Sequence, residues 1–294
     1  IRRPPRSTLF PYTTLFRSYA HLVSVKAFDA NGQGSYADVI RGIDWVVANS
    51  DELKLRVLNL SLSATPQSYY WDDPLNRAVM RAWESGLVVV ASAGNGGPDP
   101  MSIGVPGNVP YVITVGAMTD SYTIGDNGDD RLASFSAAGP TVEGFVKPEV
   151  VAPGGHVVGL MGSSTTIATA YPEFHDGGAY FTMSGTSQSA SIVSGIAALV
   201  LEADPSLTPD MVKCKIMSAA RPAVDASGNL AYSVFQARHD AQVRRGLGRH
   251  ASALNRVPGL RIVRDAEVDP RGAIEPARPR RQGRDELACR GDDI

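Results

Sequence analysis

The hydrophobic positions of this chain alternate between short, almost wholly apolar runs and longer stretches in which apolar residues recur with a helical period. Five runs have the length and composition of buried strands. They cover residues 22–28, 56–62, 87–91, 109–115 and 146–151. Strands that alternate with helices in this way predict an α/β fold with a mostly parallel sheet.

Four helical patterns lie between or after these strands, and each has a recognisable start or stop signal. Ser35 is placed to cap the first, Asp73-Pro74 begins the second, and Gly86 ends it. Residues 187–201 form an apolar third helix, and Thr208-Pro209 starts the last. The predicted buried faces of the first two helices are Val39, Ile40, Ile43, Val46 and Val47, then Leu75, Ala78, Val79, Ala82 and Trp83.

The same periodicity divides the chain into three segments. Residues 1–18 lack any period, repeat the triplet Thr-Leu-Phe, and resemble translated sequencing-adaptor DNA, so we expect them to be non-native; a disordered leader is the alternative. Residues 19–236 carry the α/β pattern and form the predicted domain. Residues 237–294 are rich in Arg without Lys, and we expect a frameshifted or disordered tail.

Charge and composition exclude several classes of function. The predicted domain holds 11 basic and 21 acidic residues, a net charge of −10 that disfavours nucleic-acid binding. No run approaches the roughly 18–20 apolar residues of a membrane-spanning helix. Cys214 and Cys289 fit no metal or redox motif, and a disulfide between them stays open.

Two polar residues occupy positions where α/β proteins place their chemistry. Ser187 stands at the start of an apolar helix, just after a glycine, where the helix dipole favours a developing anion. Asn95 follows the apolar strand 87–91, at the edge of the sheet where binding sites form. Taken alone, Ser187 is better explained as an ordinary N-cap, and Asn95 also fits an ordinary turn residue beside glycines.

Several collinear motifs together decide between these alternatives. Met183–Ala190 resembles the serine motif of the subtilisin-like proteases, and Ala91–Gly97 resembles their oxyanion-hole motif. Val57–Ser63 is similar to the strand that walls the substrate cleft, and Ala133–Pro140 and Lys147–Gly154 resemble two further family stretches. The resemblance covers about 200 residues and implies a three-layer, subtilisin-like fold.

The resemblance also implies a role for each matched position. Ser187 is expected to be the nucleophile, and Asn95, with the backbone N–H of Ser187, is expected to bind the oxyanion. The substrate-binding residues are expected to be Ser61, Leu62, Ser63, Ser92, Ala93 and Gly94. Departures from the family pattern are Gln188, Ser189 and Ser191 after the nucleophile, and Ser63 where glycine is usual in the cleft wall, a change expected to narrow the pocket.

Half of the family's catalytic machinery is absent from the printed sequence. No Asp-Ser-Gly, Asp-Thr-Gly or His-Gly motif occurs in it, so the central aspartate-bearing strand and the catalytic-histidine helix are expected to be missing. We expect a gap between strands 22–28 and 56–62, or direct pairing of the two. His175-Asp176 is an unsuitable substitute, because adjacent residues cannot orient each other and Ser187 as a triad does.

These observations predict a secreted, monomeric serine endopeptidase in the intact protein, acting on extended polypeptides without a required cofactor, metal, nucleic acid or membrane. The chain as printed is expected to be nearly inactive. The alternative is a naturally truncated relative that binds peptides without cutting them. A nucleotide-binding protein is disfavoured, because the glycine fingerprint is incomplete. Structural Ca²⁺ has no motif, since Asp126–Asp130 does not match an EF-hand and suits a solvated loop.

Overall fold

The computed structural model describes residues 20–29, 32–119, 130–222 and 261–262. These residues form a seven-stranded sheet of order β1-β2-β3-β5-β9-β8, with β4 paired to β3. Strands β1 to β3 and β5 are parallel to their neighbours, whereas β4 and β9 run antiparallel to β3 and β5. The strands are β1 Val57–Leu60, β2 Val88–Ser92, β3 Ile113–Thr119, β4 Arg131–Leu132, β5 Val150–Pro153, β8 Arg221–Pro222 and β9 Arg261–Ile262.

Three of the main helices begin at the predicted caps. The helices are α1 Tyr36–Ala48, α2 Ser50–Leu53, α3 Pro74–Glu84, α4 Thr166–Ala170, the 3-10 turn η1 Pro172–Phe174, α5 Thr186–Ala203 and α6 Pro209–Ala219. Ser35 forms a capping box with Asp38 on α1, and Asp73 Oδ1 accepts from the backbone N–H groups of Leu75 and Asn76 on α3. Thr208 caps α6. Local sequence therefore determined where these helices begin.

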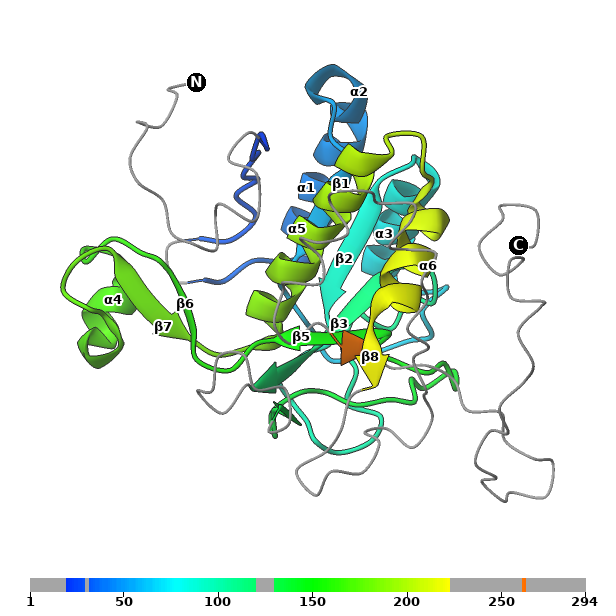
Figure 1. Cartoon of the computed structure of the whole chain (residues 1–294). Coiled ribbons are helices and arrows are strands. Elements are labelled where there is room, and N and C mark those ends of the chain that lie inside the picture. The colour runs from blue at the N-terminus through cyan, green and yellow to red at the C-terminus, as the bar shows by residue number, and fades with distance from the viewer. Residues whose placement is uncertain (1–19, 30–31, 120–129, 223–260, 263–294) are drawn as a thin grey trace, which may run out of the picture.

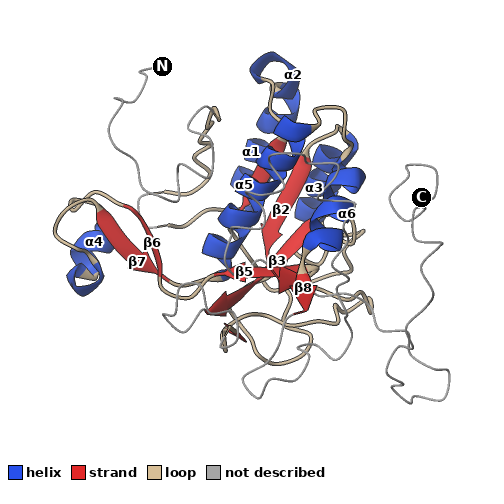
Figure 2. Ribbon diagram, in the orientation of Figure 1, coloured by secondary structure: helices blue, strands red, loops and turns tan. Residues whose placement is uncertain are grey.

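The sheet lies between two layers of helix (Figure 1; Figure 2). Helix α5 packs across strands β1, β2, β3 and β5, while α3 packs on β2 and α1 packs on α3. Strand β2 is buried along its whole length, as a parallel strand covered on both faces must be. The expected three-layer α/β architecture with a mostly parallel sheet is confirmed.

Close contact between α5 and β5 fixes the start of α5 against the sheet. Ser189 Oγ, fully buried, donates to the carbonyls of Ala152 and Pro153 at 3.0 and 3.2 Å, and Gly185 N donates to Gly154 O at 2.8 Å. A side chain on Gly154 would collide with Ala117 Cβ and Gly185 O. This glycine lets the loop before Ser187 lie directly on the strand ends.

The predicted strands at 109–115 and 146–151 begin later in the structure. β3 starts at Ile113 and β5 at Val150, each about four residues further along the chain. Pro110 and Pro148 explain the shift, because proline has no N–H to donate to a sheet ladder. Apolar character alone extends the predicted strands over these prolines.

The prediction of a strand at 22–28 is wrong. Among the described residues no strand lies there, and Leu22 is 95% exposed. The segment instead lies beside α1, with Val25 Cγ1 3.3 Å from where a Cβ of Gly42 would stand. A strand needs a hydrogen-bonding neighbour, and within the described ranges neither this segment nor the outer edge of β1 has one, so direct pairing of the two does not occur.

A second, antiparallel pair of strands projects from the main sheet (Figure 1). β6 Val157–Leu160 pairs with β7 Tyr180–Met183, and α4 and η1 lie in the connection between them. We call residues 157–183 the hairpin lobe. β7 leads directly into α5, so the lobe stands next to Ser187 in the chain.

The proposed end segments lie mostly outside the described residues. None of residues 1–18 is described, and of residues 237–294 only Arg261–Ile262 is, as strand β9 between β5 and β8. Cys214 of α6 is disulfide-bonded, and the chain's other cysteine, Cys289, lies outside the described part.

Candidate active site

Ser187 lies in the first turn of α5, where the predicted nucleophile was expected. Gly185 precedes the helix and has an extended backbone, with φ 160° and ψ 157°. Ser187 Oγ donates to Ser61 O at 3.3 Å, and Ser61 Oγ donates to Ser187 O at 3.0 Å. The serine is half-buried, so its hydroxyl faces the end of β1 and stays open to solvent on the other side.

Asn95 follows β2 and is held by Thr186, the residue directly before Ser187. The N–H and the hydroxyl of Thr186 both donate to Asn95 Oδ1 at 2.9 Å, and Gly94 N donates to Thr186 Oγ1 at 3.2 Å. With Oδ1 engaged in this way, Nδ2 is the end of the amide left to donate to a ligand. The sequence reading did not single out Thr186, although its place between Gly185 and Ser187 was the available signal.

The other expected substrate-binding residues lie on two adjacent segments. Ser61–Ser63 continue from β1, and Ser92–Gly94 run from β2 toward Asn95. Ser92 Oγ donates to Leu62 O at 2.9 Å and links the two segments. The structure thus brings every sequence-predicted site residue to the carboxyl ends of neighbouring parallel strands.

His175 and Asp176 are occupied within the hairpin lobe. His175 Nε2 lies 3.1 Å from Met161 O, and its Nδ1 accepts from Gly177 N. Asp176 Oδ1 accepts from the N–H groups of Gly178 and Tyr180, which lower the pKa of its carboxyl. Both ring nitrogens of His175 are thus engaged by backbone groups of the hairpin lobe, Nδ1 by Gly177 N and Nε2 by Met161 O.

In the described part of the chain no group of three or more His, Cys, Asp or Glu side chains is placed to hold a metal ion. The acidic stretch Asp126–Asp130, considered for Ca²⁺, falls outside the described residues apart from Asp130. No described helix combines the length and apolarity needed to cross a bilayer.

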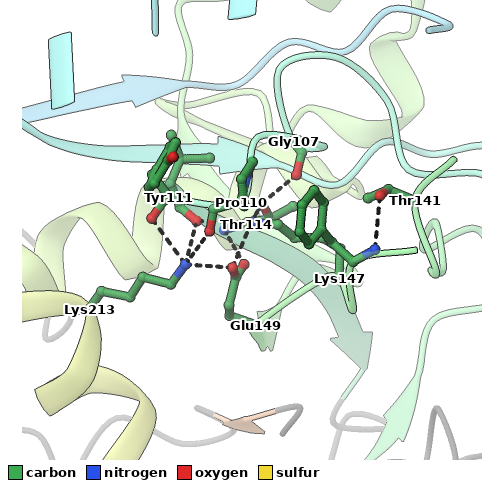
Figure 3. Close-up of polar contacts among 10 residues, drawn as sticks. Gly107, Pro110, Tyr111, Thr114, Thr141, Lys147, Glu149 and Lys213 are labelled. Carbon is green, nitrogen blue, oxygen red and sulfur yellow. Dashed lines mark hydrogen bonds and ion pairs between the residues drawn. The ribbon is translucent and has the colours of Figure 1, made fainter. Parts of the chain in front are cut away.

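A buried cluster of three charged side chains, Lys147, Glu149 and Lys213, lies at the start of β5 and is hydrogen-bonded to β3. Lys147 Nζ and Lys213 Nζ both contact Glu149 Oε1, at 2.6 and 2.7 Å. Lys213 reaches from α6 to Glu149 and to the carbonyls of Pro110 and Tyr111 (Figure 3). Glu149 Oε2 accepts from Thr114 N at 2.9 Å, so the carboxylate is fully engaged. Lys147 is 1% exposed and Glu149 7%. Because the cluster has two ammonium groups and one carboxylate, the carboxylate balances the charge of only one of them.

This environment shifts the pKa of both central groups. Burial, with a smaller contribution from Lys213, lowers the pKa of Lys147 to about 7 against the opposing effect of Glu149. Burial alone would raise the pKa of Glu149, but Lys147 and Lys213 outweigh it and hold that pKa below its ordinary value.

Stability is therefore expected to rise between about pH 7 and pH 10. From about 7 to 10.5 the unfolded chain binds a proton at Lys147 that the folded chain does not, so the free energy of unfolding increases with pH. Urea unfolding across this range measures the rise, and Lys147→Met, which removes the titrating group, is expected to lose it. An equal rise in the variant would contradict this assignment.

Comparison with known proteins places the chain in a family. The model of the subtilase family, Peptidase_S8, matches residues 17–248. The chain belongs to the subtilase family. This subtilase is 43% identical over 199 residues to the serine protease AprX of Bacillus subtilis, covering 66% of this chain and 45% of AprX. It is 34% identical to subtilisin amylosacchariticus of Bacillus subtilis subsp. amylosacchariticus, covering 68% of this chain and 44% of that protein. The chain thus spans less than half the length of these two relatives.

Solved structures agree with the family assignment. Sphericase superposes with a TM-score of 0.56 at 25% identity, covering 72% of this chain and 64% of its own. The S41 psychrophilic protease superposes with a TM-score of 0.55 at 26% identity, covering 68% and 61%. Serine protease chemistry is the activity of this family, and the expectation that the chain is a member is confirmed.

Proposed function

We propose that the full-length subtilase carrying this chain is a secreted, monomeric serine endopeptidase that cleaves extended polypeptides. Ser187 attacks the substrate carbonyl and forms an acyl-enzyme. Asn95 Nδ2 and the backbone N–H of Ser187 donate to the oxyanion. Ser61–Ser63 pair with the extended substrate backbone as an added strand, and Ser92–Gly94 line the primary specificity pocket. The reaction requires no cofactor.

The observation that carries this proposal is the arrangement of Thr186 between Asn95 and Ser187. The N–H and hydroxyl of Thr186 donate to the side-chain oxygen Oδ1 of Asn95, and the residue after Thr186 is Ser187. A donor is therefore preorganised beside a hydroxyl at the start of a helix, where the dipole favours negative charge. Such preorganised donors stabilise a tetrahedral oxyanion without reorganisation in the transition state.

The chain as printed has half of this machinery. A serine hydroxyl needs an adjacent base to become a strong nucleophile at neutral pH, and no aspartate or histidine motif of the family occurs in the sequence. The proposed activity therefore belongs to the serine-bearing part joined to a part that supplies the base.

A chimera tests the proposal. The aspartate- and histidine-bearing part of the Bacillus subtilis relative is joined to residues 19–222 of this chain. We expect casein hydrolysis, fluorophosphonate labelling at Ser187, and loss of both in Ser187→Ala. Asn95→Ala is expected to lower turnover by about 10²–10³, the cost measured for the equivalent change in subtilisin itself. A folded chimera, judged by circular dichroism, that neither cleaves casein nor reacts with the probe would contradict the assignment.

A further inference from the structure

Two glycines from separate segments flank the side chain of Ser63. A Cβ on Gly94 would stand 2.9 Å from Ser63 Oγ, and a Cβ on Gly104 would overlap the same oxygen. Gly104 comes from the loop before β3, whereas Gly94 lies directly before Asn95. The space that these two glycines leave by lacking side chains is thus occupied by the hydroxymethyl group of Ser63.

This space adjoins the proposed nucleophile. The side chain of Ser61 lies at the nucleophile, because Ser61 Oγ donates to Ser187 O at 3.0 Å, and Ser63 lies two residues further along the same segment. Side chains two apart in an extended chain point to the same side. A substrate carbonyl held by Asn95 Nδ2 would bring its own side chain toward the neighbouring Gly94, and hence toward Ser63.

Backbone hydrogen bonds keep Ser63 in this position. Ala64 N donates to Val105 O at 3.0 Å, and Val105 N donates to Ala64 O at 2.8 Å. Gly104 N donates to Ala93 O at 3.0 Å. The loop that carries Gly104 is thereby tied both to the residue after Ser63 and to the residue before Gly94, so the backbone at Ser63 cannot move away from the two glycines without breaking these bonds.

We propose that Ser63 is a specificity-determining residue that limits the substrate residue supplying the attacked carbonyl to a short side chain: glycine, alanine or serine. This inference rests on the proposed function, because it uses the cleft that the proposed reaction needs. A long apolar or aromatic side chain would have to displace Ser63. Differences of one or a few methylenes in such a space change discrimination by about 10–200-fold.

Peptide binding to the chain itself tests this without requiring turnover. Acetylated tetrapeptides that differ only in a C-terminal Ala or Phe are titrated into ¹⁵N-labelled chain, and the amide signals of Gly94 and Gly104 are followed by NMR. We expect the Ala peptide to bind at least about tenfold more tightly than the Phe peptide. Ser63→Gly is expected to raise affinity for the Phe peptide by at least about tenfold and to leave the Ala peptide within about threefold.

Two further variants make the result specific to Ser63. Thr65→Gly adds the same backbone freedom at an exposed position of the same segment and should keep the wild-type preference. Ser63→Ala retains most of the volume and should keep it too. Equal affinity for both peptides in the wild type, an unchanged preference in Ser63→Gly, or no binding of either peptide would overturn the inference. The proposed protease activity is tested separately by casein hydrolysis with the chimera. A failure of the Ser63 inference is therefore distinguishable from a failure of the proposed function.

Discussion

The chain as printed is expected to hydrolyse casein and peptide anilides about a millionfold more slowly than an intact relative. Loss of the histidine or the serine in subtilisin itself lowers turnover by about 2 × 10⁶, so a chain with the serine alone retains only the contribution of its oxyanion donors and cleft. Asn95 and the Ser61–Ser63 segment are in place, but among the described contacts no histidine ring nitrogen lies at Ser187 Oγ, whose partner is Ser61 O.

The measurement compares equal concentrations of this chain, its Ser187→Ala variant and the Bacillus subtilis relative. The first two are expected to be indistinguishable, because the hydroxyl contributes little without a base. Hydrolysis within about a thousandfold of the relative, abolished by Ser187→Ala, would show that another group activates the serine. A His175→Ala variant would then identify or exclude the hairpin lobe as its source.

Replacement of Glu149 by glutamine is expected to lower the free energy of unfolding by about 3–5 kcal/mol at about pH 6, below the folded-state pKa of Lys147, where that side chain is protonated. Glu149 Oε1 contacts the ammonium groups of both Lys147 and Lys213. The neutral amide would leave Lys147, 1% exposed, with Val112 O and Thr114 Oγ1 as its remaining partners and no counter-charge. Breaking a buried ion pair from one side costs far more than removing an exposed charge, because the remaining charge stays desolvated.

Urea unfolding followed by circular dichroism measures this loss. Glu52→Gln is the matched control, since Glu52 lies exposed on α2 and the same chemical change there should alter stability by less than about 0.5 kcal/mol. If Glu149→Gln shifted the midpoint no more than Glu52→Gln, the cluster would be irrelevant to stability. Raising the pH toward 9 should partly rescue Glu149→Gln, because the buried Lys147 then loses its proton more readily than in the unfolded chain.

Local signals were sufficient for the starts of three main helices. Ser35, Asp73 and Thr208 cap α1, α3 and α6 as expected, because a cap needs only a side-chain oxygen and the next turn of backbone. Ser187 and Asn95 lie where the motifs indicated, since both follow elements whose ends the sequence marks. The expected fold class followed from the strand–helix alternation.

Strand assignments were less successful, because a strand exists only with its neighbour. The run at 22–28 is as apolar as the other predicted strands, yet among the described residues it pairs with nothing. Apolar periodicity reports burial and conformation but carries no information about which chain segment will supply the ladder of hydrogen bonds.

The sequence by itself determined that the serine motif around Ser187 and the motif around Asn95 are present and that the family's aspartate and histidine motifs do not occur in it. Tertiary structure alone decided three further matters: that Thr186 orients Asn95, that Glu149 meets two lysines from separate elements, and that Ser63 fills the space beside Gly94 and Gly104. Each depends on residues far apart in the chain approaching within a few ångströms. Local propensity acts over a few residues, whereas such contacts are set by the packing of the whole sheet and its helices.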